Sequence, residues 1–298
     1  MSFEFVTKKD AFMEHKITVQ GLAPGLDIFF YSADADGNIF KWNPETLAVN
    51  KIDHPNYSVN ILKSFSKDNY LISGSADAHI RLYNLNTGKI LRKIRTKSHY
   101  IQALALHNNI LFIGYRDFPL QGWDLKLNRE LLLPPGLTFP KGVYSLLIHE
   151  ETCYIGLLSG ELLAWKIGER SFKTYKCHEQ PIFCLEIFDE YLITGSAERE
   201  IKIWYLNDFD DPKDILKGHN GSINALVYRS GYLFSAGTDN KVFVWEIPEK
   251  FPLKKTLAIY NFKAHDEPIN DMIFQNNYLV TGSSDNTVKI WDVSNLFH

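Results

Sequence analysis

Two sets of residues toward the C-terminal end of the chain combine the side chains of a hydrolase triad. Each holds a histidine, a hydroxyl residue and an aspartate at the same spacing: His219, Ser235 and Asp239 in one, His265, Thr281 and Asp285 in the other. In acyl transfer, a carboxylate orients the imidazole, which takes the proton of a nucleophilic hydroxyl. An enzyme needs one such site, whereas this set recurs, each time followed by a tryptophan (Trp245 and Trp291). The recurrence favours a structural role over catalysis.

Other patterns that would indicate a metal or nucleotide site are weak. The run from Asp34 to Asn38, with Glu45 in the twelfth position, is similar to a calcium loop. The sixth position of such a loop requires glycine for its sharp turn, and Ile39 stands there. The chain has no phosphate-loop, Cys-x-x-Cys or His-Glu-x-x-His pattern. We therefore expect no catalytic residues, no metal and no cofactor.

Composition narrows the class of protein. The 298 residues are 45% hydrophobic and carry a formal net charge of −3, so the chain can bury a core and has no overall attraction to nucleic acid. Cys153, Cys177 and Cys184 are too few and too scattered for a disulfide framework, which favours a reducing compartment. Neither a signal peptide nor a membrane-length apolar run is present. We expect a cytoplasmic location, with the nucleus as the alternative.

The elements that must position these residues repeat along the whole chain. An aromatic residue closes a short alternating strand about every 40 residues; these anchors are Trp42, Tyr83, Trp123, Trp165, Trp204, Trp245 and Trp291. Six positions before each anchor lies a turn residue: Asp36, Asp77, Asp117, Ser159, Glu198, Asp239 and Asp285. Alternation with period two, bounded by Gly, Asp and Asn, indicates half-buried antiparallel strands. The pattern predicts four strands in each of seven units.

Two of these units carry a recognisable signature. Gly218-His219 with Trp245-Glu246, and Ala264-His265 with Trp291-Asp292, resemble the Gly-His and Trp-Asp pairs of WD repeats. The resemblance implies an all-β, seven-bladed propeller of four-stranded antiparallel blades, forming a single domain over residues 1–298. The last repeat ends too soon for a fourth strand. We expect an N-terminal strand over residues 3–8 to complete the blade of residues 264–293, which joins the first and last blades and leaves no open sheet edge around the ring.

The same resemblance gives the triad-like sets another meaning. In the family they form buried tetrads, in which the carboxylate accepts from the histidine and the hydroxyl links the histidine to the indole N–H. The implied tetrads are His178, Thr194, Glu198 and Trp204; His219, Ser235, Asp239 and Trp245; and His265, Thr281, Asp285 and Trp291. Blade one has His15 at an unusual offset, and blade two has Tyr83. Blades three and four carry Ile113 and Ile155 in place of the hydroxyl, so we expect them to rely on apolar packing.

A propeller of this family implies a non-catalytic scaffold or adaptor that binds partner proteins or peptides. We expect docking on the top face, where the turns with the tetrad aspartates open. Blades three to five differ there by carrying apolar residues beside one arginine: Arg116, Phe118, Leu137, Phe139, Tyr144, Leu158 and Phe183. Such residues suit a peptide with a hydrophobic anchor. Alternatively, Phe118 and Phe139 fold inward to compensate for the missing tetrads.

A basic cluster supports a second hypothesis. It runs from Arg81 to Lys97 and includes Lys89, Arg92, Lys93, Arg95 and Lys97, on the predicted outer strand of blade two. Outer strands commonly carry charge to discourage edge pairing. The alternative is an RNA- or ribosome-associated propeller, whose affinity would fall steeply with salt. We expect a monomer that works in a larger complex, whose identity the fold does not reveal.

Overall fold

The computed structural model describes residues 7–134, 142–206, 208–247 and 258–296, and the side chains from residue 12 onward. Its strands β1 to β28 form seven antiparallel sheets of four strands each. Two 3-10 turns, at Ser66–Asp68 and Ser294–Leu296, are the only helical elements of the described ranges. The fold is the expected all-β, seven-bladed propeller, and each anchor aromatic lies in the third strand of its blade, counted across the sheet from the inner strand.

The chain divides into two compact units. The first comprises residues 1–99, 236–242 and 260–298, and the second comprises residues 100–235 and 243–259. The first unit contains three sheets: β2 (Val19–Pro24), β3 (Phe30–Asp34), β4 (Ile39–Trp42) and β5 (Val49–Asp53); β6 (Val59–Phe65), β7 (Tyr70–Ser75), β8 (His79–Asn84) and β9 (Ile90–Arg95); and β26 (Ile269–Gln275), β27 (Tyr278–Ser283), β28 (Val288–Asp292) and β1 (Thr7–Phe12).

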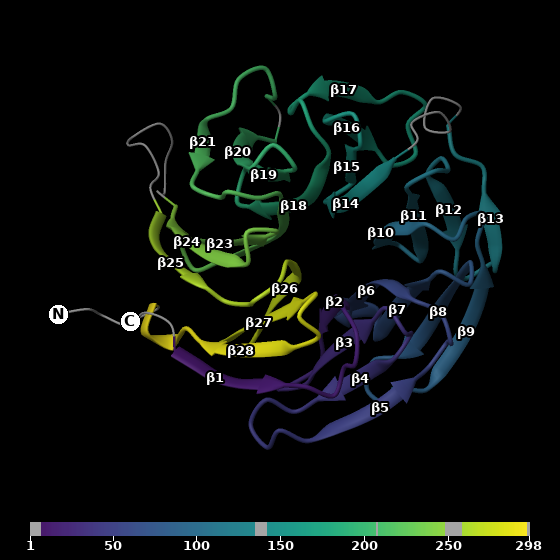
Figure 1. Cartoon of the computed structure of the whole chain (residues 1–298). Coiled ribbons are helices and arrows are strands. Elements are labelled where there is room, and N and C mark those ends of the chain that lie inside the picture. The colour runs from purple at the N-terminus through teal and green to yellow at the C-terminus, as the bar shows by residue number, and fades with distance from the viewer. Residues whose placement is uncertain (1–6, 135–141, 207, 248–257, 297–298) are drawn as a thin grey trace. The chain divides into compact units, whose positions relative to one another are not determined.

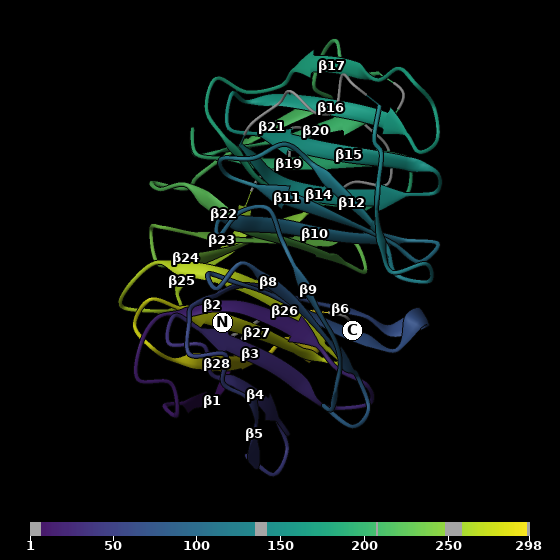
Figure 2. The same ribbon diagram turned by 90° about the vertical axis from the view of Figure 1, so that its right-hand side faces the viewer.

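The second unit also contains three sheets. They are β10 (Ile101–His107), β11 (Ile110–Tyr115), β12 (Gln121–Asp124) and β13 (Arg129–Leu131); β14 (Val143–His149), β15 (Thr152–Leu157), β16 (Glu161–Lys166) and β17 (Lys173–Lys176); and β18 (Ile182–Phe188), β19 (Tyr191–Ser196), β20 (Glu200–Tyr205) and β21 (Asp214–Lys217). Figure 2 shows β14 to β17 stacked in chain order. The residues of the seventh sheet, β22 (Ile223–Arg229), β23 (Tyr232–Gly237), β24 (Lys241–Glu246) and β25 (Ala258–Lys263), are divided between the units.

Tight turns set the register of the first two strands in a blade. Between β10 and β11, Asn108 and Asn109 both have positive φ, at 46° and 64°. Two consecutive left-handed residues make the turn whose twist matches that of a β-hairpin, and asparagine tolerates this conformation better than other side chains. The resulting register pairs His107 with Ile110 and Leu106 with Leu111. Leu111 and Ile113 are thereby turned into the core.

The N-terminal strand closes the last blade, as expected, and it extends further along the chain than residue 8. Strand β1 pairs antiparallel with β28, from Thr7 opposite Asp292 to Phe12 opposite Val288 (Figure 1). The predicted closure is confirmed, but the strand continues to Phe12, beyond the predicted end at residue 8; residues 3–6 lie outside the described part of the chain. Burial explains the placement, because Phe12 is only 5% exposed and packs with its ring centroid 4.4 Å from that of Trp42.

Side chains of β26 also fasten the last blade to the first within the first unit. Asn270 donates from Nδ2 to the carbonyl of Val19 at 2.8 Å, and the Leu22 N–H donates to Oδ2 of Asp271 at 2.8 Å. Further along, Gln275 accepts from the N–H of Gly25 at 3.1 Å. Since these bonds join segments from opposite ends of the chain, the junction does not depend on the N-terminal strand alone.

Candidate functional site

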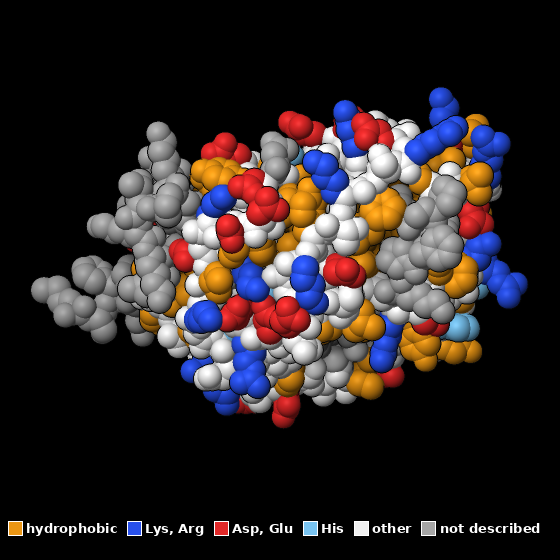
Figure 3. Space-filling model, turned by 90° about the horizontal axis from the view of Figure 1, so that it is seen from above, with side chains coloured by type: hydrophobic (Ala, Val, Ile, Leu, Met, Phe, Trp, Pro, Cys, Tyr) orange, Lys and Arg blue, Asp and Glu red, His pale blue; other side chains and the backbone are white. Residues whose placement is uncertain are grey.

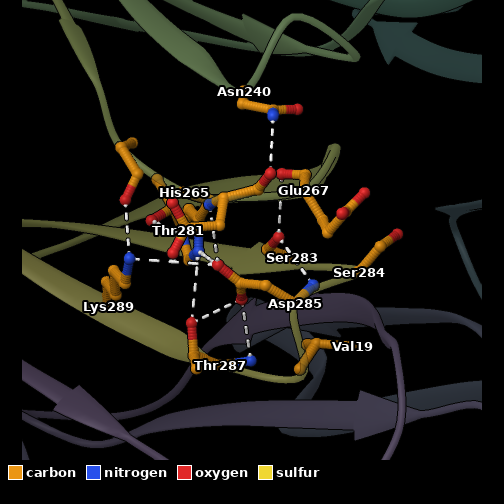
Figure 4. A network of polar contacts seen from close by, with 12 residues as sticks. Val19, Asn240, His265, Glu267, Thr281, Ser283, Ser284, Asp285, Thr287 and Lys289 are labelled. Carbon is orange, nitrogen blue, oxygen red and sulfur yellow. Dashed lines mark hydrogen bonds and ion pairs between the residues drawn. The ribbon is translucent and has the colours of Figure 1, made fainter.

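The most complete polar network of the first unit surrounds His265, and Figure 4 shows it from close by. The Nδ1–H of His265 donates to Oδ2 of Asp285 at 2.8 Å, and the hydroxyl of Thr281 bonds Nε2 at 2.7 Å. The indole Nε1–H of Trp291 donates to the same hydroxyl at 2.9 Å. Thr287 and Lys289 add further contacts to the carboxylate of Asp285. The four residues of the implied tetrad therefore form one continuous chain of hydrogen bonds.

The charges in this network follow from burial and from its hydrogen bonds. Burial lowers the pKa of His265, so the imidazole is neutral at pH 7 and Nε2 accepts the hydroxyl proton. Burial alone would raise the pKa of Asp285, but the bonds from His265 and Thr287 outweigh it and hold this pKa well below its usual range. The carboxylate is therefore charged and the histidine neutral, which is the state in which every donor has an acceptor.

The blade of β18–β21 uses a longer carboxylate for the same purpose. Glu198 accepts from Nδ1 of His178 at 2.6 Å, while Thr194 bonds Nε2 at 2.6 Å and receives the indole N–H of Trp204 at 3.0 Å. Nζ of Lys202 lies 3.0 Å from Oε1 of Glu198, the oxygen that also accepts from His178. Burial lowers the pKa of His178 to about 4. Against the opposing effect of burial, hydrogen bonds from the Glu179 N–H and His178 lower the pKa of Glu198 to about 2.

The hydroxyl part of the tetrad is also formed in the sheet of β22–β25. Ser235 bonds Nε2 of His219 at 2.7 Å and accepts the indole N–H of Trp245 at 2.8 Å. Asp239 lies in the turn between β23 and β24, where it accepts from the backbone N–H of Lys241 at 3.3 Å.

Blade one contains a tetrad that the spacing of its residues concealed. His15 donates from Nδ1 to Asp34 at 2.7 Å and meets the hydroxyl of Ser32 through Nε2 at 2.6 Å. Trp42 completes the set by donating to Ser32 at 2.6 Å. The turn position expected for the carboxylate, Asp36, is exposed. One signal was available in the sequence: His15 lies four residues before the first residue of an inner strand, as the other tetrad histidines do.

In blade two, an arginine four residues after the turn aspartate binds its carboxylate, at the position where Lys202 and Lys289 stand in their blades. Arg81, which is 6% exposed, binds Asp77 through both terminal nitrogens, and Tyr83 donates its hydroxyl to Asp53 at 2.6 Å. Burial would raise the pKa of Asp77, but Arg81 outweighs it and lowers this pKa. Arg81 is therefore a buried partner of Asp77 and does not belong to the exposed basic cluster, contrary to the expectation from sequence.

Blades three and four lack the hydroxyl, and their tryptophans behave differently. Trp165 donates its Nε1–H to the carbonyl of Glu169 at 3.0 Å. The Nε1 of Trp123 is buried and finds no partner among the described residues. Ile113 and Ile155, which occupy the hydroxyl positions, are 0% and 1% exposed. One indole has thus found a backbone acceptor and the other carries an unsatisfied donor.

The tetrads hold strands together and leave little scope for chemistry. In the tetrads of His15, His178 and His265, both histidine nitrogens are engaged, and the hydroxyls are fully buried; these hydroxyls belong to Ser32, Thr194 and Thr281. A hydroxyl that already accepts an indole N–H inside the core cannot reach a substrate carbonyl. Among the described residues, no group of three or more His, Cys, Asp or Glu side chains is arranged to hold a metal ion.

The expected docking residues that the structure describes lie in the second unit, at the end where its inner strands begin. Arg116 and Leu158 follow β11 and β15, and both side chains are exposed. Tyr144 and Phe183 are the second residues of β14 and β18; both are half-buried, and their ring centroids lie 5.3 Å apart. Phe118 is 39% exposed with its edge against Tyr115. Leu137 and Phe139 lie outside the described residues. We call Arg116, Tyr144, Leu158 and Phe183 the aromatic rim.

Backbone geometry supports this rim. Gly142 accepts the N–H of Leu158 through its carbonyl at 2.7 Å, and its φ of +79° favours glycine. A Cβ added to Gly142 would lie 2.5 Å from Cβ of Leu158. The close approach fixes the start of β14 against the end of β15, so Tyr144 and Leu158 present their side chains from one rigid corner.

Charged side chains, free thiols and the short helical elements complete the description of the molecule. Lys89, Lys93, Arg95 and Lys97 are exposed on or beside β9, the outer strand of its sheet, as predicted. On the face drawn in Figure 3, acidic and basic side chains are interspersed. The three cysteines are free. None of the helical elements found in the described residues has the length and apolar character to span a membrane.

Comparison with known proteins agrees with this architecture. The family model for the WD domain, G-beta repeat, matches residues 48–84, 169–205, 210–246 and 257–292. An uncharacterized WD repeat-containing protein of Schizosaccharomyces pombe is 23% identical over 231 residues, covering 73% of this chain and 62% of that protein. The kinesin-like protein KIF21B of Mus musculus is 31% identical over 258 residues, covering 83% of this chain and 13% of that protein. The chain thus spans less than two thirds of both relatives.

A solved structure shows the same fold. The WD40 beta propeller domain of Doa1 superimposes with a TM-score of 0.82 over 97% of both chains, at 17% sequence identity. Propellers of this kind are generally protein-interaction scaffolds. With four matched repeats, seven four-stranded blades and tetrads that link histidine, hydroxyl and tryptophan, the chain belongs to the family of WD-repeat β-propeller proteins.

Proposed function

We propose that this chain is a non-catalytic scaffold or adaptor that binds partner proteins or peptides through the aromatic rim. The observation that carries the proposal is a substitution pattern at the second residue of the inner strands. Five blades place an amide side chain there: Gln20, Asn60, Gln102, Asn224 and Asn270. Two adjacent blades place Tyr144 and Phe183 instead. Because β14 and β18 pack side by side, the two rings form one half-exposed apolar surface.

The amides at this position have a structural task that the aromatic rings do not share. Asn270 donates to the carbonyl of Val19 at 2.8 Å, and Asn60 donates to the carbonyl of His99 at 3.4 Å. Neither Tyr144 nor Phe183 has an amide with which to make such a bond. Aromatic residues and arginine contribute most to binding energy at interfaces. Arg116 and Leu158 occupy equivalent positions, directly after the second strands of consecutive blades. The rim therefore suits a peptide with a hydrophobic anchor and a nearby carboxylate.

The lack of catalysis is part of the proposal. Its support is the burial of the tetrad hydroxyls and the full engagement of their histidines. The kinesin-like relative, of which the chain covers 13%, contains a similar segment as one part of a long protein. A binding module would be used in this way. Cytoplasmic location and membership of a larger complex stay predictions.

The test is a comparative affinity purification. Tyr144→Asn and Phe183→Asn, combined in one variant, install the residue type that other blades carry, so the fold should tolerate them. Gln20→Asn is the matched control at the same strand position in the first unit, and unchanged melting curves establish that each variant is folded. We expect wild type and control to retain a common set of proteins that the double variant and Arg116→Glu lose. If both folded rim variants retain every partner, the aromatic rim is not the docking surface.

A further inference from the structure

Strand β9, with its flanks, forms a basic strip that differs from the other outer strands. Between Lys89 and Lys97 there are five basic residues and no acidic residue. The strand itself carries three basic residues, Arg92, Lys93 and Arg95. Among the other outer strands, β17 has two lysines and β25 has one, without an acidic residue, and β5, β13 and β21 each pair one basic residue with one acidic residue. Because the whole chain has a net charge of −3, this strip is a local reversal of its charge.

A β-bulge adds an aliphatic surface to one end of the strip. Ile90 pairs with Tyr83 and Arg92 with Leu82, so Leu91 is an extra residue in β9. Alternation along a regular strand would turn one of two consecutive side chains inward. Here Ile90 and Leu91 are 54% and 55% exposed. A bulge in an edge strand re-aims side chains, and the effect is to place two aliphatic groups on the surface next to Arg92 and Lys93.

The acidic residue that Lys93 approaches already has another partner. Asp77 is bound by the buried guanidinium of Arg81, and Lys93 comes no nearer than 3.9 Å to it. Lys93, Arg95 and Lys97 remain exposed. In the described part of the chain, β9 is the last strand of its sheet, so its outer edge is not paired with another strand. An exposed strand edge with aliphatic side chains tends to pair with another chain unless a binding partner covers it.

We propose that the strip of Lys89–Lys97 docks an extended acidic segment of a partner protein, with an apolar residue of that segment against Ile90 and Leu91. The segment would add to the edge of β9 along Arg92–Arg95, where pairing is regular, and its carboxylates would meet Lys93 and Arg95. The exposed apolar groups here are aliphatic, whereas single-stranded RNA is held by stacking on aromatic rings. The site is separate from the aromatic rim and does not depend on it.

The test uses full-length chain and three fluorescent probes. The first is a short peptide of alternating Glu and Thr that begins with two leucines; the second has Gln in place of every Glu; the third is single-stranded RNA of similar length. Binding is followed by fluorescence anisotropy. Lys93→Glu with Arg95→Glu reverses two exposed charges on the strip, and Leu91→Ser removes an aliphatic contact. Lys173→Glu with Lys176→Glu, on β17, is the matched control, and melting curves verify all variants.

We expect the acidic peptide to bind wild type and the control equally, and to bind the strip variant about tenfold or more weakly, since two attractions become repulsions. Leu91→Ser should weaken it severalfold, and the Gln peptide should bind little. Three outcomes would overturn the proposal: equal binding of strip variant and control, no effect of Leu91→Ser, or RNA bound more tightly than the acidic peptide. The last result would make the strip a nucleic-acid site.

Discussion

The unsatisfied indole of Trp123 allows the value of one tetrad hydrogen bond to be measured. Ile113 and Ile155 occupy the same position, ten residues before Trp123 and Trp165, and both are buried. We compare threonine with valine at each site, because the two side chains have nearly the same shape and differ only in that threonine has a hydroxyl where valine has a methyl group. The difference between Ile113→Thr and Ile113→Val then reports the hydroxyl alone. Ile155 is the matched reference, since Trp165 already donates to the carbonyl of Glu169 at 3.0 Å.

The expected magnitudes follow from the two environments. Each valine variant loses one buried methylene and should cost about 1 kcal/mol. At position 155 the added hydroxyl gains no indole donor, so threonine should be about 1–2 kcal/mol worse than valine. At position 113 the hydroxyl accepts the orphaned N–H of Trp123, which recovers about 1–2 kcal/mol. Urea titrations followed by tryptophan fluorescence measure these differences, provided the slopes agree. Equal threonine-minus-valine values at the two positions would refute the reasoning.

Three further predictions concern the first, fifth and last blades. Asp34→Ala should lower the free energy of unfolding by about 2–3 kcal/mol, because it leaves the buried His15 without its acceptor. Asp36→Ala, at an exposed position, should lower it by less than about 0.5 kcal/mol. Thermal denaturation that ranks the two variants the other way would contradict the assignment of Asp34 to the tetrad. Phe12→Ala should lower the free energy of unfolding by about 3–4 kcal/mol, because it removes the ring that packs against Trp42 and leaves a cavity. A variant as stable as wild type in urea would argue against closure by β1. Burial lowers the pKa of His178 from 6.5 to about 4. Between these pH values the unfolded chain takes up a proton that the native chain does not, so the free energy of unfolding should fall by about 2 kcal/mol as the pH falls from 6.5 to 4. His178→Gln should flatten this pH dependence, and an unchanged slope would speak against the role of His178.

The repeat and its strands could be predicted because they depend on local periodicity. Aromatic anchors at regular spacing, with alternating apolar residues before them, require only that each strand bury one set of side chains, and this property is visible in any short window. The tetrad of Trp291 could be predicted in the same way, since its members recur at fixed offsets. Where the spacing between histidine and carboxylate was irregular, as for His15, the pattern predicted the blade but not which aspartate accepts from the histidine.

Only the tertiary structure decided which polar groups meet. Asp34 and Asp36 are two residues apart, and the choice between them depends on how the segment holding His15 approaches the turn. The indole N–H of Trp165 donates to a backbone carbonyl, and because every residue has a carbonyl, the sequence gives no sign of which one accepts. The bulge at Leu91 arises from a shift in pairing with the neighbouring strand. Hydrophobic burial tolerates small displacements, whereas a hydrogen bond requires its atoms within about 3 Å and well aligned. The sequence by itself therefore determined the blades and their core, and the packing of distant segments determined the polar contacts and the exposed surfaces.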